Sequence, residues 1–314
     1  MFTRPGRIPL LFSATLTLLG AAAVLVPSGA ASAARAFPVT VHGANGAVEI
    51  AARPTAIVSL SPTATEMLYA IGAGSQVKAV DLDSNYPPGV PRTQLDGTNP
   101  NVEAIASYKP DLVLASDEAT SVDTQLHALG ITVVSLPPAA DLSQEYAQFA
   151  ELGRLTGHET AARAEVGTIK HQIARIVASV HRAARPETYY YELDQTYYSA
   201  TSSTFIGQLL ALLGLRSIAD AAKGAAANGG YPQLSGEFIL KADPDYILLA
   251  DTICCGQSAA TVAGRPGWSG LAAVTHGRVL GLDDDVASRW GPRVVDLLAA
   301  VAAEVRAHPA GGTS

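Results

Sequence analysis

Charged side chains are scarce in this sequence: Asp, Glu, Lys and Arg make up 16% of its 314 residues, against 48% hydrophobic residues. Chains that stay disordered have the opposite balance, low hydrophobicity with high charge, so intrinsic disorder is excluded. Basic residues are also outnumbered, with 21 Lys and Arg against 28 Asp and Glu, and they form no cluster along the sequence. We therefore expect no nucleic-acid partner.

Metal-binding and catalytic motifs are missing as well. The only two cysteines are too few for a disulfide scaffold or a cysteine zinc site, and no two of the seven histidines have ligand spacing. The sequence contains no G-x-S-x-G elbow, P-loop or dinucleotide fingerprint. Residues 81–85 begin like a calcium loop, but Tyr86 and Arg92 stand where that loop needs Gly and Glu. The sequence thus predicts no resident metal or cofactor and gives no reason to propose an enzyme.

The N-terminus has the pattern of a signal peptide. Arg4 and Arg7 precede an apolar stretch over 10–26, and Ala31-Ser32-Ala33 is a small-x-small cleavage signature. We predict that residues 1–33 are a Sec-type signal peptide and that the mature chain is exported to the periplasm or cell envelope. No cysteine for lipid attachment lies near the cleavage site. The alternative is an N-terminal membrane anchor, although the apolar stretch is barely long enough to span a bilayer.

The rest of the chain alternates short apolar runs with helical patterns, which favours parallel sheets covered by helices. Between two such groups lies a long helical stretch, from about 158 to 182, that contains no proline. Runs typical of strands occur at 56–60, 77–80, 112–115, 131–135, 188–193, 246–250 and 278–281.

This pattern predicts an α/β protein of two lobes joined by one long helix. The expected organisation is a lead-in at 34–52, an N-terminal lobe at 53–156, a bridging helix at 157–184, a C-terminal lobe at 185–306 and a tail at 307–314.

An internal repeat supports the two-lobed prediction. Glu103 lies seven residues before the Pro-Asp pair at 110–111, and Glu237 lies seven residues before the Pro-Asp pair at 244–245. An apolar strand follows each pair, so the match extends over about fifteen residues and indicates two similar lobes. The alternative is a common helix–turn–strand pattern that recurs by chance.

Tyrosines gather in the second half of the chain. Residues 189–191 are three consecutive tyrosines in a predicted strand, and we expect them mainly in the core. Tyr197, Tyr198 and Tyr231 lie where a strand end or a loop is expected. Ligands of open α/β sheets bind beyond the carboxyl ends of the strands, so these three are candidate pocket walls for a large, flat, partly apolar ligand.

Five motifs resemble a known family, the extracytoplasmic solute-binding proteins of ABC importers that take up cobalamin, ferric siderophores and haem. The resemblance covers residues 53–306, and its carriers are 57–66, 84–88, the two Glu-x6-Pro-Asp repeats, 231–237 and 288–293.

The resemblance implies two Rossmann-like lobes with parallel sheets bridged by a single long backbone helix. It also implies a monomeric, non-enzymatic protein that binds a small-molecule metal chelate or corrinoid and docks on a membrane permease. Glu103 and Glu237 match surface glutamates that pair with permease arginines. The alternative is that both acids only complement a helix dipole.

The resemblance also implies where the ligand binds. Tyr198, Tyr231 and Arg289 match pocket positions of the cobalamin-binding branch, and Asp83 stands where that branch has a pocket tyrosine. The ligand-binding residues predicted are Asp83, Tyr86, Tyr198, Tyr231, Arg289 and Trp290.

The first choice of ligand is a corrinoid, so any cobalt or iron belongs to the ligand. A ferric siderophore is the second choice, if Arg289 with Arg293 or Arg265 binds an anionic chelate. Haem is third, because residues 97–100 lack the tyrosine that the haem-binding branch has before Glu103.

Two features stay open. Cys254 and Cys255 are adjacent after a predicted strand, and are expected either as a vicinal disulfide at the pocket rim or as two buried thiols, with a thiolate contact to a metal as a third alternative. A secreted enzyme built on the binding fold is the alternative of a different class, because fold does not decide function. It would need an acid and a base together in the cleft, and Asp83 with Asp251 would be that pair.

Overall fold

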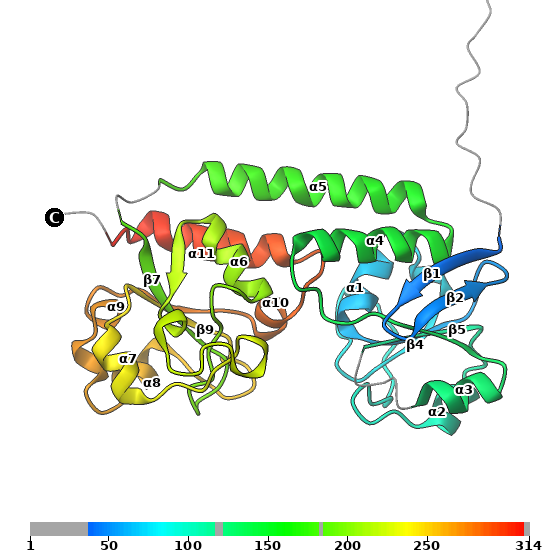
Figure 1. The fold of residues 1–314 in the computed structure, drawn as a ribbon, viewed down its shortest axis with the longest axis horizontal. Coiled ribbons are helices and arrows are strands. Elements are labelled where there is room, and N and C mark those ends of the chain that lie inside the picture. The colour runs from blue at the N-terminus through cyan, green and yellow to red at the C-terminus, as the bar shows by residue number, and fades with distance from the viewer. Residues whose placement is uncertain (1–36, 117–121, 182–184, 311–314) are drawn as a thin grey trace, which may run out of the picture. The chain divides into compact units, whose positions relative to one another are not determined.

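A computed structural model describes residues 37–116, 122–181 and 185–310, which lie within one compact unit, Ala34–Ser314 (Figure 1). The predicted signal peptide, residues 1–33, lies outside the described residues. The chain first forms an antiparallel hairpin of β1 (Val39–Gly43) and β2 (Gly46–Ile50). This hairpin lies within the predicted lead-in at 34–52, and its buried Val39 and Val41 alternate with exposed Thr40, as a strand requires.

The N-terminal lobe is built on a parallel four-stranded sheet in the order β4-β3-β5-β6. All four strands are short and largely buried, as expected for a parallel sheet covered on both faces. Its strands are β3 (Ile57–Leu60), β4 (Val77–Val80), β5 (Leu112–Ala115) and β6 (Thr132–Ser135). Its helices are α1 (Pro62–Ala70), α2 (Val102–Ser107), α3 (Asp123–Ala128) and α4 (Leu142–Thr156).

The C-terminal lobe repeats this topology in a parallel sheet of order β10-β9-β7-β8. In both sheets the first and third strands in chain order are central neighbours, and the second strand lies outside the first. The strands are β7 (Glu187–Glu192), β8 (Leu215–Ser217), β9 (Tyr246–Leu249) and β10 (Val279–Gly281). The helices are α6 (Phe205–Leu212), α7 (Gly236–Ala242), α8 (Ala259–Ala263), α9 (Ala272–Thr275), α10 (Asp284–Ser288) and α11 (Val294–Ala307).

The sequence repeat corresponds to the same local structure in both lobes. Lys109 and Asp243, each directly before the Pro-Asp pair, both have left-handed backbone angles, with φ of 52° and 44°. Asp111 then accepts hydrogen bonds from the backbone N–H and the hydroxyl of Thr55, at 2.7 and 2.9 Å. Asp245 does the same for Thr188, at 2.8 and 3.0 Å. In each lobe the repeated aspartate therefore fixes the beginning of the first central strand.

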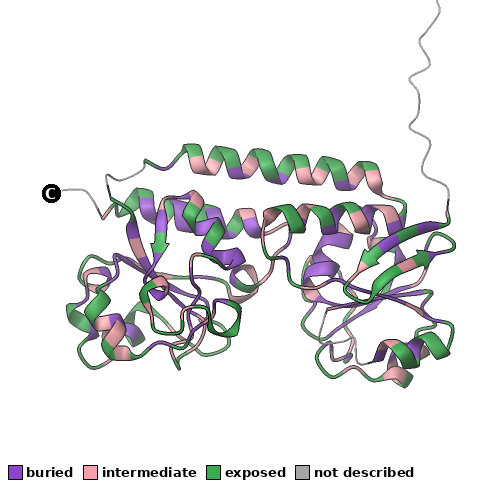
Figure 2. Cartoon of the chain, viewed as in Figure 1, coloured by how far each residue is buried: buried purple, intermediate pink, exposed green. Residues whose placement is uncertain are grey.

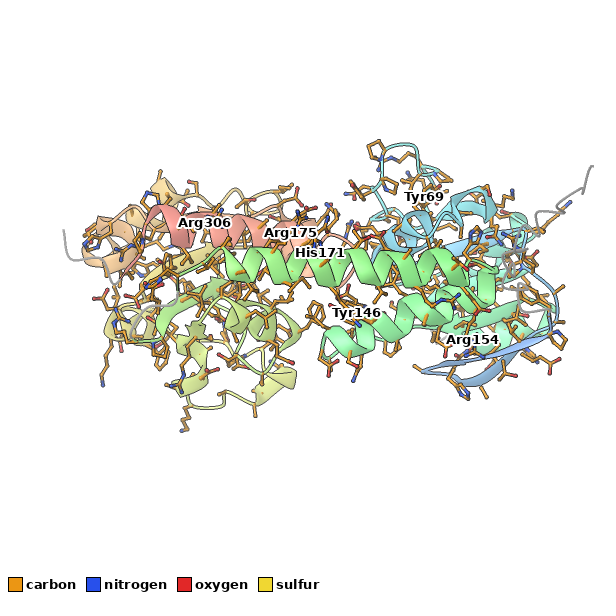
Figure 3. All side chains as sticks on the ribbon, turned by 90° about the horizontal axis from the view of Figure 1, so that it is seen from above. Tyr69, Tyr146, Arg154, His171, Arg175 and Arg306 are labelled. Carbon is orange, nitrogen blue, oxygen red and sulfur yellow. A yellow bond between two sulfur atoms is a disulfide. The ribbon has the colours of Figure 1, made fainter. Side chains whose placement is uncertain are left out.

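One helix, α5 (Glu159–Ala178), packs on α4 of the N-terminal lobe and on α11 of the C-terminal lobe. Its buried residues Ala162, Ile169 and Ile173 lie on one side, and most of the helix surface is exposed (Figure 2). Gly153 of α4 allows the close approach, because a Cβ there would lie 2.7 Å from the Cβ of Ala162. Figure 3 looks down on α5, with exposed His171 and Arg175 along it.

The predicted fold class, two parallel α/β lobes bridged by a long helix, is confirmed. The bridging helix is shorter than the predicted 157–184, since Gly157 with φ of 75° ends α4 and α5 ends at Ala178. Buried Tyr189, Tyr190 and Tyr191 lie in the core, as expected. Among the described residues, no helix is long and apolar enough to cross a membrane.

Candidate functional site

A buried cluster of charges joins the two lobes. Glu66, on α1 of the N-terminal lobe, accepts a 2.8 Å hydrogen bond from Arg289 and two more from Arg293, at 2.9 and 2.6 Å. Both arginines follow α10 in the C-terminal lobe. The Arg289 side chain is only 8% exposed and that of Glu66 1%. Together with Asn85 and Asp285, these three residues are called the inter-lobe bridge below.

Asn85 and Asp285 extend this bridge toward the ends of the strands. Asp285 accepts a 2.6 Å hydrogen bond from Arg289 and another of 2.6 Å from the side-chain amide of Asn85, which lies in the loop after β4. Arg289 also donates to the Asn85 side-chain oxygen and to the backbone carbonyl of Asp83, at 3.0 and 2.9 Å. The bridge therefore ties the carboxyl-end loop of one sheet to α10 beside the other sheet.

The two predicted aromatic residues nearest the bridge have different environments. Tyr86 is 39% exposed, and the Arg293 guanidinium lies 4.4 Å from its ring centroid. Trp290 is half-buried against the core, and its indole N–H donates a 3.0 Å hydrogen bond to the side chain of Gln148 on α4. Of these two, Tyr86 offers the more accessible ring surface for a ligand.

A second arginine–carboxylate pair lies at the carboxyl end of β7. Arg265 donates two parallel hydrogen bonds to the fully buried Glu192, at 2.6 and 2.5 Å, and the planar guanidinium suits this bidentate contact. Arg265 also lies 4.7 Å from the Trp268 ring centroid, and Tyr197 stacks on Trp268. Arg265 and Tyr197, which the sequence presented as candidate ligand contacts, thus already have partners within the lobe.

Two buried aspartates follow strands in the two lobes. Burial and the nearby Glu192 carboxylate raise the pKa of Asp251, two residues after β9, to about 7. Burial raises the pKa of Asp81, directly after β4, to about 6. Asp251 therefore lies beside Glu192, and no hydrogen bond joins it to Asp83 among the residues that the structure describes. The described residues therefore contain no hydrogen-bonded Asp83–Asp251 pair, which is the acid–base pair that the enzyme alternative would need.

Tyr198 and Tyr231 come from two segments that pair with each other. Tyr198 forms an isolated antiparallel bridge with Gln233, and the Ser199 backbone N–H donates to the Pro232 carbonyl at 3.0 Å. Both tyrosines are half-buried, and burial raises the pKa of Tyr231. These two tyrosines therefore lie in a pair of hydrogen-bonded loop segments of the C-terminal lobe. Tyr86 and Asp83 belong to the N-terminal lobe.

The two repeated glutamates have equivalent positions. Glu103 lies in the first turn of α2, whose N-cap is Asn101, and Glu237 lies in the first turn of α7, whose N-cap is Ser235. Both side chains are exposed. Figure 1 shows α2 and α7 at the end of their lobes that is remote from α5. Each lobe thus has one exposed carboxylate on a helix at the end that is remote from α5.

Cys254 and Cys255 form a disulfide between neighbours in the loop after β9. Both residues are exposed. The loop is held by Asp284 on α10, whose carboxylate accepts backbone hydrogen bonds from Thr252 at 2.8 Å, Ile253 at 3.0 Å and Cys254 at 2.7 Å. Although burial opposes it, these bonds lower the pKa of Asp284 below its usual value.

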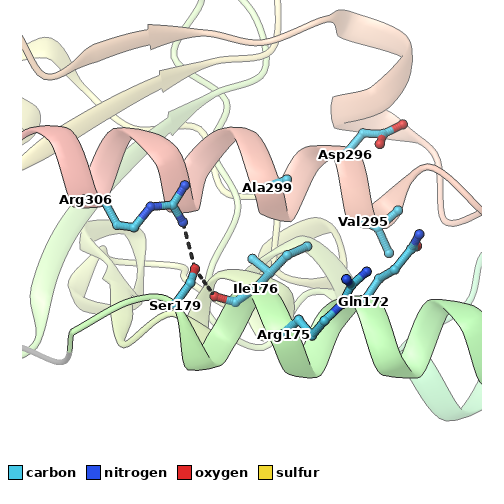
Figure 4. Close-up of a pocket in the computed structure, with 8 residues that line it drawn as sticks. All are labelled: Gln172, Arg175, Ile176, Ser179, Val295, Asp296, Ala299 and Arg306. Carbon is cyan, nitrogen blue, oxygen red and sulfur yellow. Dashed lines mark hydrogen bonds between the residues drawn. The ribbon is translucent and has the colours of Figure 1, made fainter.

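The described residues form no metal centre, and none of the predicted ligand-binding residues lines the groove between α5 and α11. Within 37–116, 122–181 and 185–310, no group of three His, Cys, Asp or Glu could hold a metal ion. A groove of about 400 Å³ lies between α5 and α11, lined by Arg175, Ser179, Asp296 and Arg306 among others (Figure 4). Arg306 there donates a 2.8 Å hydrogen bond to the Ser179 hydroxyl.

Arg289 was predicted from the sequence, but its pairing with Glu66 was not. Glu66 stands within the 57–66 motif and Arg289 within the 288–293 motif, so each motif was visible, but their pairing depends on how the lobes meet. Glu192 gave no sequence signal beyond its place at a strand end.

Comparison with known proteins identifies the family. A model of the periplasmic binding protein family matches residues 57–286. The chain is 34% identical over 270 residues to the uncharacterized ABC transporter substrate-binding lipoprotein YvrC of Bacillus subtilis, covering 83% of each chain. It is 33% identical over 296 residues to a cobalamin-binding protein of Halobacterium salinarum, covering 90% of this chain and 79% of the relative.

A solved structure agrees with these matches. A possible iron-binding periplasmic solute-binding protein from Staphylococcus epidermidis superposes with a TM-score of 0.70 at 28% identity, covering 81% of this chain and 99% of the other.

Proposed function

The chain belongs to the periplasmic binding protein family, and we propose that it is the extracytoplasmic substrate-binding component of an ABC importer, capturing a corrinoid of the cobalamin type between its lobes. In this proposal it is a carrier without catalytic activity that delivers the ligand unchanged to a membrane permease. The cobalamin-binding relative from Halobacterium salinarum supports this choice of ligand class.

The observation that carries the choice of ligand is the pairing of the three arginines near the strand ends. Arg289 and Arg293 share Glu66, Arg289 also binds Asp285, and Arg265 binds Glu192. An anionic ferric chelate or a haem propionate would have to compete with these buried carboxylates for a guanidinium. Leaving a buried carboxylate without its partner costs several kcal/mol.

A ligand without net charge does not compete for these guanidinium groups, so its binding leaves each buried carboxylate with its arginine. Hydrogen-bonding groups at the edge of such a ligand can bind other polar groups. Cyanocobalamin carries no net charge, has amide groups around the corrin ring, and has broad apolar faces. Tyr86 from the N-terminal lobe and Tyr198 and Tyr231 from the C-terminal lobe are the aromatic side chains proposed to contact these faces. Asp83 lies three residues before Tyr86 in the same loop and is proposed to accept a hydrogen bond from a ligand amide.

Arg289 and Trp290 are proposed to position the residues that contact the ligand. Arg289 holds the backbone carbonyl of Asp83 and the side chain of Asn85, so it fixes the loop that carries Tyr86. Trp290 anchors the same C-terminal segment to Gln148. Both residues thus remain in the proposed site, as positioning residues.

Delivery to a permease is assigned to Glu103 and Glu237. One exposed carboxylate per lobe, at equivalent helix positions, allows two bidentate contacts with arginines whose spacing fixes the docking geometry. Delivery outside the cytoplasm also requires export, which we propose occurs through the signal peptide of residues 1–33. Mass spectrometry of the exported protein should then show a chain that begins at Ala34.

The ligand proposal is tested by calorimetric titration of the mature protein with cyanocobalamin, a panel of ferric siderophores and haemin. We expect one-to-one binding of cyanocobalamin and recovery of unchanged cyanocobalamin after release. Binding of a ferric chelate alone would leave the carrier function intact and overturn the corrinoid. A chemically altered ligand would instead support an enzyme built on this fold.

A further inference from the structure

Large apolar and aromatic side chains are exposed at only five positions among the described residues: Leu82, Tyr86, Tyr108, Leu129 and Ile253. Single exposed apolar residues are ordinary, but three of these five follow the carboxyl ends of strands. Leu82 and Tyr86 lie in the loop after β4, and Ile253 lies in the loop after β9. Ligands of open parallel sheets bind at this edge.

Hydrogen bonds connect the two loops through α10. Asp284 holds the backbone of the loop that contains Ile253, and the next residue, Asp285, accepts the 2.6 Å hydrogen bond from Asn85. Asn85 directly precedes Tyr86. Adjacent carboxylates at the beginning of one short helix therefore bind the two loops that carry these exposed residues. Figure 1 shows this helix on the side of the C-terminal lobe that faces the other lobe.

Ile253 and the neighbouring disulfide are fixed from both ends of their loop. On one side, the Asp284 carboxylate binds three successive backbone N–H groups, those of residues 252–254. On the other side, the Gln257 amide donates to the Cys255 carbonyl at 3.3 Å and its oxygen accepts from Arg265 at 2.7 Å. The backbone N–H groups of residues 252–254 thus bind within the protein, whereas residues 253–255 are exposed to solvent.

A disulfide between neighbours has no hydrogen to donate and adds two polarizable sulfur atoms to the apolar surface of Ile253. We propose that Ile253, Cys254 and Cys255, called the 253–255 tip, form an apolar contact surface for the bound ligand, opposite Leu82 and Tyr86 of the N-terminal lobe. This inference rests on the proposed function for the identity of the ligand: a plate-shaped molecule with apolar faces, as a corrin is. It adds to that proposal a binding surface in the C-terminal lobe that depends on the redox state of the protein.

Ile253→Ser tests the apolar contact, with Leu129→Ser as a matched control. Ile253 is 68% exposed and Leu129, at the end of α3, is 59% exposed, so neither change removes a core residue. We expect Ile253→Ser to weaken cyanocobalamin binding about tenfold and Leu129→Ser to leave it unchanged. Equal affinities of both variants would overturn the proposal.

The disulfide is tested by reduction with a water-soluble phosphine. Water supplies its oxygen to the phosphine, which is oxidised to the phosphine oxide, and its two hydrogens go to the two sulfurs, which become thiols. The reagent is removed by desalting under argon before titration, and mass spectrometry should record a gain of two hydrogens. We expect weaker ligand binding by the reduced protein and by Cys254→Ser/Cys255→Ser. Undiminished binding by both would exclude the disulfide from the contact surface.

A ligand-independent arm separates failure of the tip from failure of the corrinoid proposal. Nile red, an uncharged apolar dye, should bind the native protein and the Leu129→Ser variant with the same fluorescence gain, and Ile253→Ser with a smaller gain. If cyanocobalamin does not bind but the dye distinguishes Ile253→Ser, the corrinoid proposal fails and the tip stands. If neither cyanocobalamin nor the dye distinguishes the two variants, the tip fails.

Discussion

Arg289 Nη1 lies 2.8 Å from Glu66 Oε1, so two residues separated by 223 positions join the lobes through a buried charge pair. Arg293 binds the same carboxylate. In this part of the described structure, Glu66 is therefore the only acid of the N-terminal lobe that lies between two arginines of the C-terminal lobe. Removing one partner of such a cluster leaves uncompensated buried charge.

Glu66→Gln should lower the free energy of unfolding by about 3 kcal/mol, because two buried arginines lose their shared carboxylate. The measurement is urea unfolding followed by circular dichroism. Glu151→Gln is the matched control: Glu151 also pairs with an arginine, Arg154 at 3.0 Å, but on a partly exposed helix surface. We expect the control to cost less than about 1 kcal/mol. Equal losses in the two variants would contradict a stabilising role for the inter-lobe bridge.

Glu145 should make stability depend on pH. It is fully buried on α4, neither carboxylate oxygen has a hydrogen-bond partner among the described residues, and burial raises its pKa to about 8. Since its folded pKa lies above the ordinary value of 4.5, the folded protein keeps a proton that the unfolded chain releases. Stability from this group is therefore complete below about pH 4.5 and falls as the pH rises toward 8.

Glu145→Gln removes this titration while keeping the shape of the side chain. We expect the variant to gain about 4 kcal/mol over the native protein at pH 8 and to come close to it at pH 4.5. Unfolding free energies measured from pH 4.5 to 8.5 provide the test. A constant difference between the two proteins over this range would show that Glu145 does not titrate in the folded state.

Asp245 should act in the opposite sense. Although burial opposes ionisation, hydrogen bonds from Arg185 and Thr188 lower its pKa below 3.8. The stability it contributes is therefore present above about pH 4 and is lost as the pH falls through the folded pKa. Asp245→Asn should cost about 2 kcal/mol at pH 7, and the difference from the native protein should shrink below pH 4. A cost that persists unchanged at pH 3 would argue against an ionised Asp245 in the folded protein.

The repeated glutamates should matter for delivery and not for capture. Glu103→Arg and Glu237→Arg each reverse a charge in the first turn of an exposed helix, and we expect each to lower ligand uptake through the permease about tenfold or more. Calorimetric ligand affinity should stay at the native value. Glu49→Arg, on the exposed face of β2, is the control for charge reversal alone and should retain native uptake.

The alternating pattern and the repeat were sufficient to predict the two lobes, because burial on both faces of a parallel sheet leaves continuous apolar runs. The Pro-Asp repeat was informative for a physical reason as well: each aspartate binds the start of a neighbouring strand. The hairpin of β1 and β2 and the short strand β8 were missed. Five- and three-residue strands show too few alternations to stand out, and β1 was recognisable only from Val39 and Val41.

The partners of the candidate site residues were less predictable. Arg289 and Arg265 appeared as free cations in the sequence, because Glu66 and Glu192 lie 223 and 73 positions away in the chain. Only the tertiary fold shows that these charges are already neutralised. The same applies to Ile253, whose exposure depends on the hydrogen bonds that turn the loop backbone toward Asp284.

The most direct test of the account is the affinity of the mature protein for cyanocobalamin, measured by calorimetry together with Tyr86→Ala and its matched control Tyr108→Ala. These tyrosines are 39% and 40% exposed, so they differ in position and hardly in accessibility. We predict one-to-one binding that Tyr86→Ala weakens about tenfold and Tyr108→Ala leaves unchanged. Binding that is absent in the native protein, or equally affected by both substitutions, would contradict it.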